Sequence, residues 1–362
     1  MNFAPTIVER LARARADLRM GVPIVLLGPQ SKLVFAAETL DVLRLNDILS
    51  LDGDPVLAIT ERRATTLKAR AYDGDVARIL LPNDVKLAWI QAIADPADDL
   101  QNPMKGPLNT EREGDAEGHR MAIALAKAAR LLPSAVVINI PNGENFAAQN
   151  GLTSVQMAEA APHLAQSSML HPVVQARLPI EAAEAGRLHL FRPEDGAEEH
   201  YAIEIGRADR TKPVLARLHS ACFTGDVLGS LKCDCGPQLR GALAQMGTEG
   251  TGVLLYLNQE GRGIGLANKM RAYSLQDQGF DTVEANHRLG FEDDERDFKL
   301  GAYILKSMGF SSVRLLTNNP AKVDMMKKSG VDVAERVPLK VGENKFNTAY
   351  LATKAAKSGH LF

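Results

Sequence analysis

Residues 253–277 read VLLYLNQEGRGIGLANKMRAYSLQD, which predicts a strand, a glycine-rich turn and a helix in direct succession. Residues 253–257 are a short apolar run of the kind found in buried strands, and residues 266–277 follow as the helix. The glycines of the turn would let backbone amides approach a phosphate at the helix N-terminus. Their spacing is G-x-G-x-G, one residue short of the dinucleotide-binding pattern G-x-G-x-x-G. A plain glycine turn is the alternative, although Glu260 and Arg262 are unusual residues for a simple connection.

Downstream of this stretch, the sequence predicts two more helices around a strand. Residues 293–308 are predicted to form a helix, because acids occupy the first turn and the apolar residues share one stripe of Phe298, Ala302, Leu305 and Met308. A strand over residues 313–316 precedes the polar turn Thr317-Asn318-Asn319 and a helix that opens at Pro320 and is closed by Gly330. With Lys322, this turn is a reasonable anion site. Ordinary helix capping explains its Thr and Asn residues equally well.

The rest of the chain shows short apolar runs that alternate with helical stretches, a mixed α/β pattern. In the first half, the predicted strands are residues 24–27, 32–37, 56–60 and 135–140, and the predicted helices are residues 7–19 and 119–131. The polar tract 96–115 is predicted to be a long loop. The second half opens with strands near residues 188–191 and 201–205. We therefore expect two domains of α/β (α+β) type, 1–170 and 172–362, in which mixed sheets are flanked by helices.

The composition is that of a soluble globular protein long enough for two domains: 362 residues, 45% hydrophobic, 24% charged, with a formal net charge of −2. The lack of a basic excess argues against a nucleic-acid partner. No apolar run approaches the roughly 18 residues that a membrane helix needs, so no membrane partner is expected. The arginine-rich N-terminal stretch is interpreted as the first helix and not as a transit peptide, because Glu9 and Asp17 interrupt it.

All three cysteines lie in one short segment, in which ten residues separate Cys222 from Cys233-Asp234-Cys235. An odd, clustered set does not fit a disulfide framework, so we expect reduced cysteines and a cytoplasmic protein. Thiolates favour zinc, and three of them leave a fourth tetrahedral position open, as a hydrolytic site requires. Two alternatives remain. One is three buried cysteines without a metal, although their neighbours are polar, and the other is a closed structural site with His219 as the fourth ligand.

Taken together, these motifs resemble the GTP cyclohydrolase II family. The resemblance covers residues 172–362, and the motifs occur in order and in register. Without this resemblance, the acidic run 293–297 would be interpreted as a solvent-exposed first turn of a helix. The matching runs are Arg217-Leu218-His219-Ser220-Ala221-Cys222-Phe223-Thr224-Gly225-Asp226, Ser230-Leu231-Lys232-Cys233-Asp234-Cys235-Gly236, Gln259-Glu260-Gly261-Arg262, residues 273–289, Asp294-Glu295-Arg296, Thr317-Asn318-Asn319-Pro320 and Gly359-His360-Leu361.

The resemblance implies hydrolysis of GTP to formate, pyrophosphate and a diaminopyrimidinone ribosyl phosphate, the first committed step toward riboflavin. It implies one zinc ion per chain, held by Cys222, Cys233 and Cys235, whose water attacks C8 of guanine. It also implies magnesium bound with the triphosphate, and a homodimer. By their positions in the motifs, the substrate-contacting residues would be Arg217, Leu218, His219, Ser220, Gln238, Glu260, Gly261, Arg262, Thr282, Thr317 and Lys322.

The resemblance assigns catalytic roles to three further residues. Arg296 matches the residue proposed to attack the α-phosphorus, Asp294 matches its proton acceptor, and Tyr273 matches a further catalytic position. Arginine stays protonated to about pH 12 and beyond, and a protonated guanidinium is no nucleophile. A purely electrostatic clamp on the phosphates is therefore an equally reasonable role for Arg296.

Two residues depart from the family pattern. Ala221 stands where the family often has Glu, and Asn258 stands where Arg is frequent. Either change could alter the grip on the substrate, so a related hydrolase acting on another purine nucleotide is one alternative. A zinc-stabilised nucleotide-binding regulator without turnover is another. Release of formate from GTP separates the regulator from an enzyme.

The first half carries a fainter resemblance, in residues 117–122 and 135–140, to 3,4-dihydroxy-2-butanone 4-phosphate synthase. That enzyme needs an acidic loop after its first strand, where this chain reads Leu27-Gly28-Pro29-Gln30-Ser31-Lys32, and a Glu where Asn139 stands. His119 survives, but a metal site built from carboxylates cannot work without them. The resemblance therefore implies a catalytically inactive relic over residues 1–170, retained for folding or dimer contacts.

Overall fold

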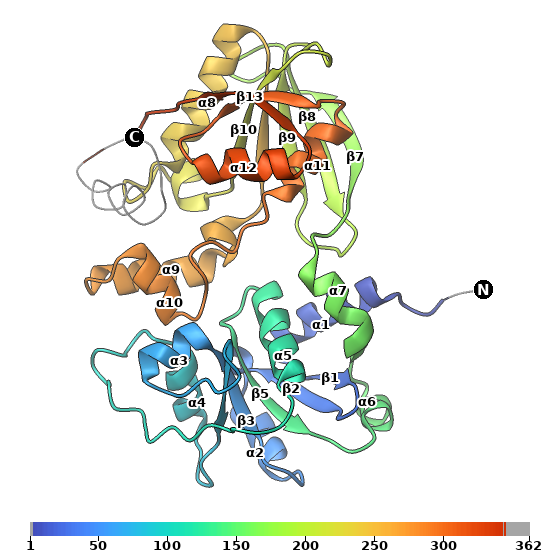
Figure 1. Ribbon diagram of the computed structural model, residues 1–362, viewed down its shortest axis with the longest axis vertical. Helices are drawn as coiled ribbons and strands as arrows, with labels where there is room; N and C mark the ends of the chain where they lie inside the picture. Colours follow the sequence, from blue (N-terminus) through green and yellow to red (C-terminus); the bar gives the residue numbers. More distant parts are fainter. Residues whose placement is uncertain (1–2, 343, 345–362) are drawn as a thin grey trace. The chain divides into compact units, whose positions relative to one another are not determined.

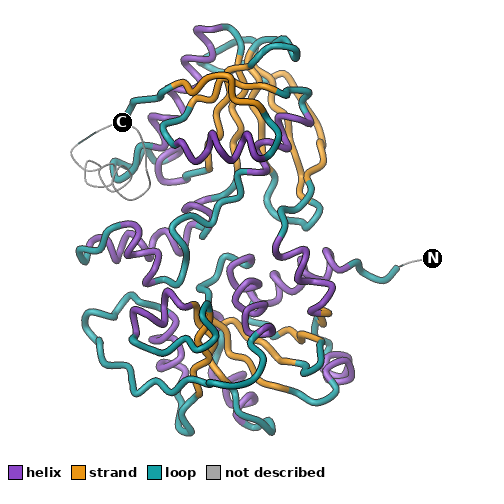
Figure 2. Tube along the Cα trace, in the orientation of Figure 1, coloured by secondary structure: helices purple, strands orange, loops and turns teal. Residues whose placement is uncertain are grey.

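The computed structural model describes residues 3–342 and 344, which form two compact units, each built on its own sheet (Figures 1 and 2). Within the described residues, the first unit comprises the chain up to Gln166 together with Ala267–Glu295, and the second comprises Ser167–Leu266 together with the residues from Arg296 onward. This architecture confirms the predicted fold class, mixed sheets flanked by helices. The first unit takes up residues 267–295 from the predicted second domain, so the compact units are not two consecutive stretches of chain.

The first unit contains a six-stranded sheet in the order β4-β3-β5-β2-β1-β6. Its strands are β1 (Ile24–Leu27), β2 (Lys32–Ala36), β3 (Val56–Thr60), β4 (Val76–Leu80), β5 (Ser134–Asn139) and β6 (Ser154–Gln156). Alternate residues such as Ile24 and Leu26 share a core with α1 (Ile7–Arg19), α5 (Glu117–Ala128) and α7 (Met157–Ala165). Every residue of β1 and β2 is buried, so both faces of the sheet are covered there. Further helices are α2 (Val42–Leu49), α3 (Glu61–Leu67), α4 (Leu87–Ala94), α6 (Gly143–Asn150), α9 (Leu266–Asp277), α10 (Thr282–Arg288) and the short η1 (Ala37–Thr39).

The second unit contains a seven-stranded sheet in the order β13-β12-β10-β11-β9-β8-β7 (Figure 1). Its strands are β7 (Leu170–Arg177), β8 (Gly186–Pro193), β9 (His200–Ile205), β10 (Val214–Ser220), β11 (Gly252–Leu257), β12 (Ser312–Leu316) and β13 (Asp332–Val337). Helix α8 (Cys235–Glu249) shares a core with one face of the sheet, and α11 (Lys299–Ser307) and α12 (Pro320–Lys328) share a second core with the other strand residues. The short turns η2 (Phe223–Val227) and η3 (Glu260–Gly263) follow β10 and β11.

The centre of this sheet is parallel: β10 pairs with β11 on one side and with β12 on the other. In the β10–β11 register Ser220 lies opposite Leu257, so these two strands end together. The loops after Ser220, Leu257 and Leu316 therefore leave the same edge of the sheet. The carboxyl edge of parallel strands is where open α/β sheets bind their ligands.

Most of the predicted elements lie within a few residues of their predicted bounds, and α1, β1, β3 and α9 match them. The helix predicted over residues 293–308 is wrong at its start, because α11 begins only at Lys299. The backbone of the acidic residues before Lys299 is not helical, and their side chains form hydrogen bonds with other groups. Asp293 is bonded to His287, Glu295 accepts hydrogen bonds from the Glu292 N–H and from Lys127, and Asp297 accepts one from the Lys299 N–H.

Two segments outside these elements carry predictions from the sequence. The tract 96–115 is a loop, as predicted, and Asp99 within it forms ion pairs with Arg63 and Lys105. The motif Gly359-His360-Leu361 lies outside the described residues. Among the helices of the described residues, none combines the length and apolarity needed to cross a bilayer.

Candidate functional site

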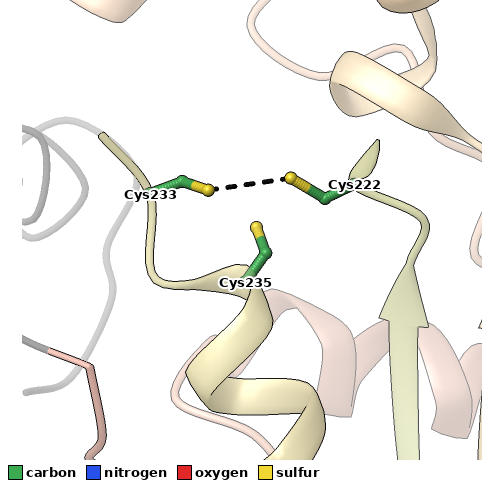
Figure 3. A group of neighbouring side chains, drawn as sticks. All are labelled: Cys222, Cys233 and Cys235. Carbon is green, nitrogen blue, oxygen red and sulfur yellow. Dashed lines mark hydrogen bonds between the residues drawn. The ribbon is translucent and has the colours of Figure 1, made fainter. Parts of the chain in front are cut away.

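The three cysteines meet at the carboxyl edge of the second unit's sheet, with their sulfurs pointing toward one another (Figure 3). Cys222 follows β10, Cys233 lies in the loop after η2, and Cys235 begins α8. All three sulfurs lie within 4.8 Å of one another, and those of Cys222 and Cys233 are 3.7 Å apart. A tetrahedral zinc ion with zinc–sulfur bonds of about 2.3 Å places its sulfurs about 3.8 Å apart. The cluster therefore has the spacing of a metal centre.

Three thiols this close oppose one another's ionisation in the absence of a cation. Contacts with the Cys222 and Cys233 sulfurs, and then burial, raise the pKa of the Cys235 thiol well above its usual value. The pKa of Cys233 is also raised, first by its contact with Cys222. A divalent cation removes this penalty, because a coordinated thiol binds as the thiolate. The chemistry of the donor set therefore fits a metal better than three inert core cysteines.

Gly225 and Gly236 allow the backbone to close around the sulfurs. A Cβ on Gly225 would lie 2.7 Å from the Cys233 sulfur, a distance that real Cβ atoms essentially never show, and 3.0 Å from the Cys222 sulfur. The Gly225 N–H instead donates a hydrogen bond to the Cys222 sulfur over 3.3 Å. A Cβ on Gly236 would meet the Gly225 carbonyl oxygen at 2.1 Å. Contact between the cysteine loop and the start of α8 therefore requires glycine at both positions.

Within the described residues, these cysteines are the one group of His, Cys, Asp or Glu side chains with metal-ligand spacing. His219 is not part of it, because its Nε2 lies 3.0 and 3.1 Å from the carboxylate oxygens of Asp226. The closed site with His219 as fourth ligand, which the sequence left open, is therefore not formed. A tetrahedral ion held by the three thiolates would keep one position for water or substrate, as catalytic zinc sites do.

Asp226 is a buried carboxylate that the sequence did not single out as functional. Its side chain is 3% exposed. Besides its contact with His219, it accepts hydrogen bonds from the Cys222 backbone N–H at 3.0 Å and from the Tyr256 hydroxyl at 2.9 Å. The His219 and Tyr256 rings stack with their centroids 5.5 Å apart. In the sequence, Asp226 is only an acid four residues after Cys222. Its contact with Cys222 depends on the turn η2, which brings the two residues together.

Two predicted cationic residues meet at the end of β10. Arg296 Nη1 donates a hydrogen bond to the Ser220 hydroxyl at 3.3 Å, and Lys322 Nζ donates one to the Leu218 carbonyl oxygen at 3.1 Å. Both cations lie over the Phe298 ring, 4.7 and 4.8 Å from its centroid. A guanidinium and an ammonium held together in this way suit the binding of a phosphate group.

Arg217 and Gln238, both predicted substrate contacts, are bonded to each other. Arg217 donates from Nη1 to the Leu316 carbonyl oxygen at 3.0 Å and from Nη2 to the Gln238 amide oxygen. The Gln238 amide nitrogen donates in turn to Asp234, which lies between Cys233 and Cys235. Burial lowers the pKa of Arg217 to about 10, which still leaves a cation at neutral pH. Its Nε is buried and has no hydrogen-bond partner within the described part of the chain.

The glycine-rich turn folds back onto the cysteine loop. The Glu260 carboxylate accepts hydrogen bonds from the Phe223 N–H at 2.6 Å and from the Gly261 N–H at 2.9 Å. Gly261 and Arg262 both have left-handed backbone, with φ of 62° and 60°. This conformation is natural for glycine but costs a residue with a side chain about 1–2 kcal/mol. The turn is therefore strained at Arg262, and such strain is found most often at functional sites.

Thr317 and Asn258 have structural partners of their own. The Thr317 hydroxyl accepts the Asn319 N–H at 3.1 Å, and Asn319 caps α12, as ordinary helix capping predicts. Asn258 ties the end of β11 to the start of β9, because its side chain donates to the Glu199 carbonyl oxygen and its N–H donates to His200 Nδ1 at 3.0 Å. Asn258 therefore has a structural role at the end of β11.

The other predicted residues, Tyr273, Thr282 and Asp294, belong to the first unit. The Lys269 ammonium lies over the Tyr273 ring, 5.7 Å from its centroid. The Thr282 hydroxyl accepts a hydrogen bond from Gln276 at 3.3 Å. Their roles in a site with the cysteines remain predictions from the sequence.

The contacts of Gly225 give a direct test of the cysteine centre. We expect Gly225→Ala to bind zinc at least about 10-fold more weakly, a loss comparable to that of an outer partner of a metal site, because the new Cβ pushes the ligand sulfurs apart. Gly241→Ala is the matched control, since a Cβ there would make ordinary contact with Val341 at 3.5 Å. Zinc content after dialysis, measured by elemental analysis, compares the two. Equal zinc in both variants would contradict the placement of the metal.

Comparison with known proteins gives the chain a family. Residues 171–338 match the family model described as GTP cyclohydrolase II. A solved structure of a two-domain 3,4-dihydroxy-2-butanone 4-phosphate synthase from A. baumannii aligns with 92% of this chain and all of its own, at 17% identity and a TM-score of 0.32. A TM-score this low does not establish a shared arrangement.

The relatives named GTP cyclohydrolase-2 are much more similar. The protein from Azospirillum brasilense is 42% identical over 97% of this chain and 93% of its own length. The protein from Histophilus somni is 56% identical over 53% of this chain and 89% of its own length. The match to the first of these relatives extends over nearly the whole chain. This protein therefore belongs to the GTP cyclohydrolase II family.

Proposed function

We propose that this chain opens the imidazole ring of the guanine in GTP, releases formate and pyrophosphate, and leaves a diaminopyrimidinone ribosyl phosphate, the first step of riboflavin biosynthesis. The observation that carries the proposal is that three thiols and two cations, Arg296 and Lys322, gather around the end of the same strand, β10. A purine nucleotide offers a ring for the thiol centre and a phosphate chain for the cations. Membership in the family supports the same reaction.

In this proposal Cys222, Cys233 and Cys235 hold one zinc ion per chain. When bound, zinc supplies Lewis-acid activation of water near neutral pH, because coordination lowers the pKa of water to about 7. Cys235 opens α8, and the positive end of the helix dipole favours its thiolate. Cys222 and Cys233 are buried, which keeps bulk water away from their sulfurs.

Arg296 and Lys322 bind the phosphate chain, with magnesium on the triphosphate. A guanidinium offers a planar fork of N–H donors that matches a phosphate group, so we assign Arg296 to charge stabilisation at the α-phosphate. Asp294 as proton acceptor and Tyr273 as a further catalytic residue rest on the family resemblance. The proposed contacts to GTP rest on it too and are Arg217, Leu218, His219, Ser220, Gln238, Glu260, Gly261, Arg262, Thr282, Thr317 and Lys322.

We further propose that the protein is a cytoplasmic homodimer without a nucleic-acid or membrane partner, and that residues 1–170 are an inactive synthase-like relic. The support for the relic lies between β2 and β5, where Lys32 Nζ donates to Asn139 Oδ1 at 2.7 Å. Burial lowers the pKa of Lys32. Burial, followed by the charge of Lys32, lowers the pKa of His119 to about 4, so this histidine is neutral. An amine thus stands where a metal site would need carboxylates.

The main experiment incubates the purified protein with GTP and magnesium and analyses the products by mass. We expect about one zinc per chain and release of formate. Cys233→Ser should lose both the metal and the formate, because two thiolates hold zinc far more weakly than three. Gly241→Ala again serves as the control on α8. The zinc mechanism is contradicted if a variant with all three cysteines changed to serine releases formate at the wild-type rate.

Variants of Arg296 separate a clamp from a nucleophile. Arg296→Ala should slow pyrophosphate release about 10²- to 10³-fold, the usual cost of losing one preorganised group at a developing charge. Arg296→Lys should keep substantial activity, because lysine retains the charge although not the planar fork. Arg314→Ala, which removes a half-buried arginine paired with Glu249 and Glu335, is the control. Substantial activity in Arg296→Lys would favour charge stabilisation over an arginine-specific covalent step, and a fully active Arg296→Ala variant would refute both roles.

The inactive first domain is tested by a different substrate. Given ribulose 5-phosphate and magnesium, the protein should form no dihydroxybutanone phosphate, because Lys32 and Asn139 replace the carboxylates of the synthase. Product formation is measured against a blank without enzyme and against an active synthase. Product above the blank would show that the domain is not a relic.

A further inference from the structure

We propose that Asp226 is the positioning residue of the cysteine centre, and that its carboxylate holds both the Cys222 backbone and the His219 ring in place and thereby strengthens metal binding. The inference rests on the proposed zinc site and extends it. Asp226 belongs neither to the three ligands nor to the proposed contacts with GTP.

Cys222 is tied to Asp226 through both of its backbone groups. The Cys222 N–H donates to Asp226 Oδ2 at 3.0 Å, and the Asp226 N–H donates to the Cys222 carbonyl oxygen at 2.7 Å. The second bond closes the turn η2, and the first anchors that turn to a side chain. The position of the Cys222 sulfur therefore depends on where the Asp226 carboxylate lies.

The carboxylate is itself held from a neighbouring strand. The Tyr256 hydroxyl, from β11, donates to Asp226 Oδ2 at 2.9 Å. A carboxylate with a side chain 3% exposed must be hydrogen-bonded to be stable, and the bonds from Cys222, Tyr256 and His219 meet this need. Removal of Asp226 would leave three buried donors unpaired next to a proposed metal ligand. The local backbone would then shift to pair them.

The same carboxylate fixes the state of His219. An ionised carboxylate only accepts hydrogen bonds, so His219 Nε2, 3.0 Å from Asp226 Oδ2, carries the hydrogen. In the neutral ring, Nδ1 is then the acceptor. Asp226 therefore sets the tautomer of a residue proposed to contact GTP, while it also anchors a residue proposed to bind zinc.

The test is a competition for zinc between the intact chain and a chromophoric chelator, which reports affinity without turnover. Asp226→Ala should bind zinc about 10- to 100-fold more weakly than wild type, the usual cost of losing an outer hydrogen-bond partner of a metal site. Asp226→Asn should bind about 3- to 10-fold more weakly, because an amide has one acceptor oxygen to share among the donors. With saturating zinc, Asp226→Asn should also release formate more slowly, since its N–H₂ group cannot accept from His219.

Glu204→Gln is the matched control in the same unit. Glu204 is also a buried carboxylate, 2% exposed, and is bonded to His189 Nε2 at 3.0 Å and to Arg210 at 2.7 Å. We expect its zinc affinity to stay within about twofold of wild type, since separate sites act independently. Circular dichroism and thermal unfolding show whether each variant folds. If Asp226→Ala does not fold, Asp226→Asn alone decides.

Wild-type zinc affinity in the folded Asp226 variants would overturn the inference, and so would an equal loss in Glu204→Gln. Different outcomes would contradict the proposed function. A wild-type protein that binds zinc but releases no formate contradicts GTP ring opening, while the chelator comparison still decides the role of Asp226. A wild-type protein that binds no zinc overturns the metal site and the role of Asp226 together.

Discussion

Parallel pairing of β10 with β11 and β12 is the constraint on which the rest of the site depends. Parallel neighbours need long crossover connections, and here α8 provides the one from β10 to β11. Because the three strands run in one direction, the cysteine loop, the glycine-rich turn and the Thr317 turn all leave the same edge. Each segment alone has an ordinary structural explanation. Their common edge turns three separate patterns into one candidate site.

The region that matches the family, residues 171–338, is divided between the two units. Its segment 267–295 is bound within the first unit, where Arg271 pairs with Glu38 and Asp95 at 3.0 Å each. The Thr60 hydroxyl also donates to the Gly290 carbonyl oxygen at 2.8 Å. The first unit therefore has a structural role toward the family region, independent of any chemistry of its own.

The sequence was most informative where one physical signal dominated. Apolar runs bounded by turn residues predicted β1 and β3, and the cysteine spacing predicted a cluster whose sulfurs do lie together. The sequence missed β10, because buried Arg217 and His219 interrupt its apolar run. It also placed the start of α11 too early, since an apolar stripe cannot show that the preceding acids bond elsewhere. The role of Asp226 depends on the shape of η2, which no local pattern specifies.

Arg262 combines a strained backbone conformation with a long guanidinium side chain. Its backbone has φ of 60°, in a turn whose Glu260 is bonded to the cysteine loop. Glycine would adopt the same conformation without strain, as the neighbouring Gly261 does. The chain thus carries a less stable residue at a position where glycine would be more stable. The Arg262 guanidinium is therefore carried on a backbone conformation that lowers folding stability.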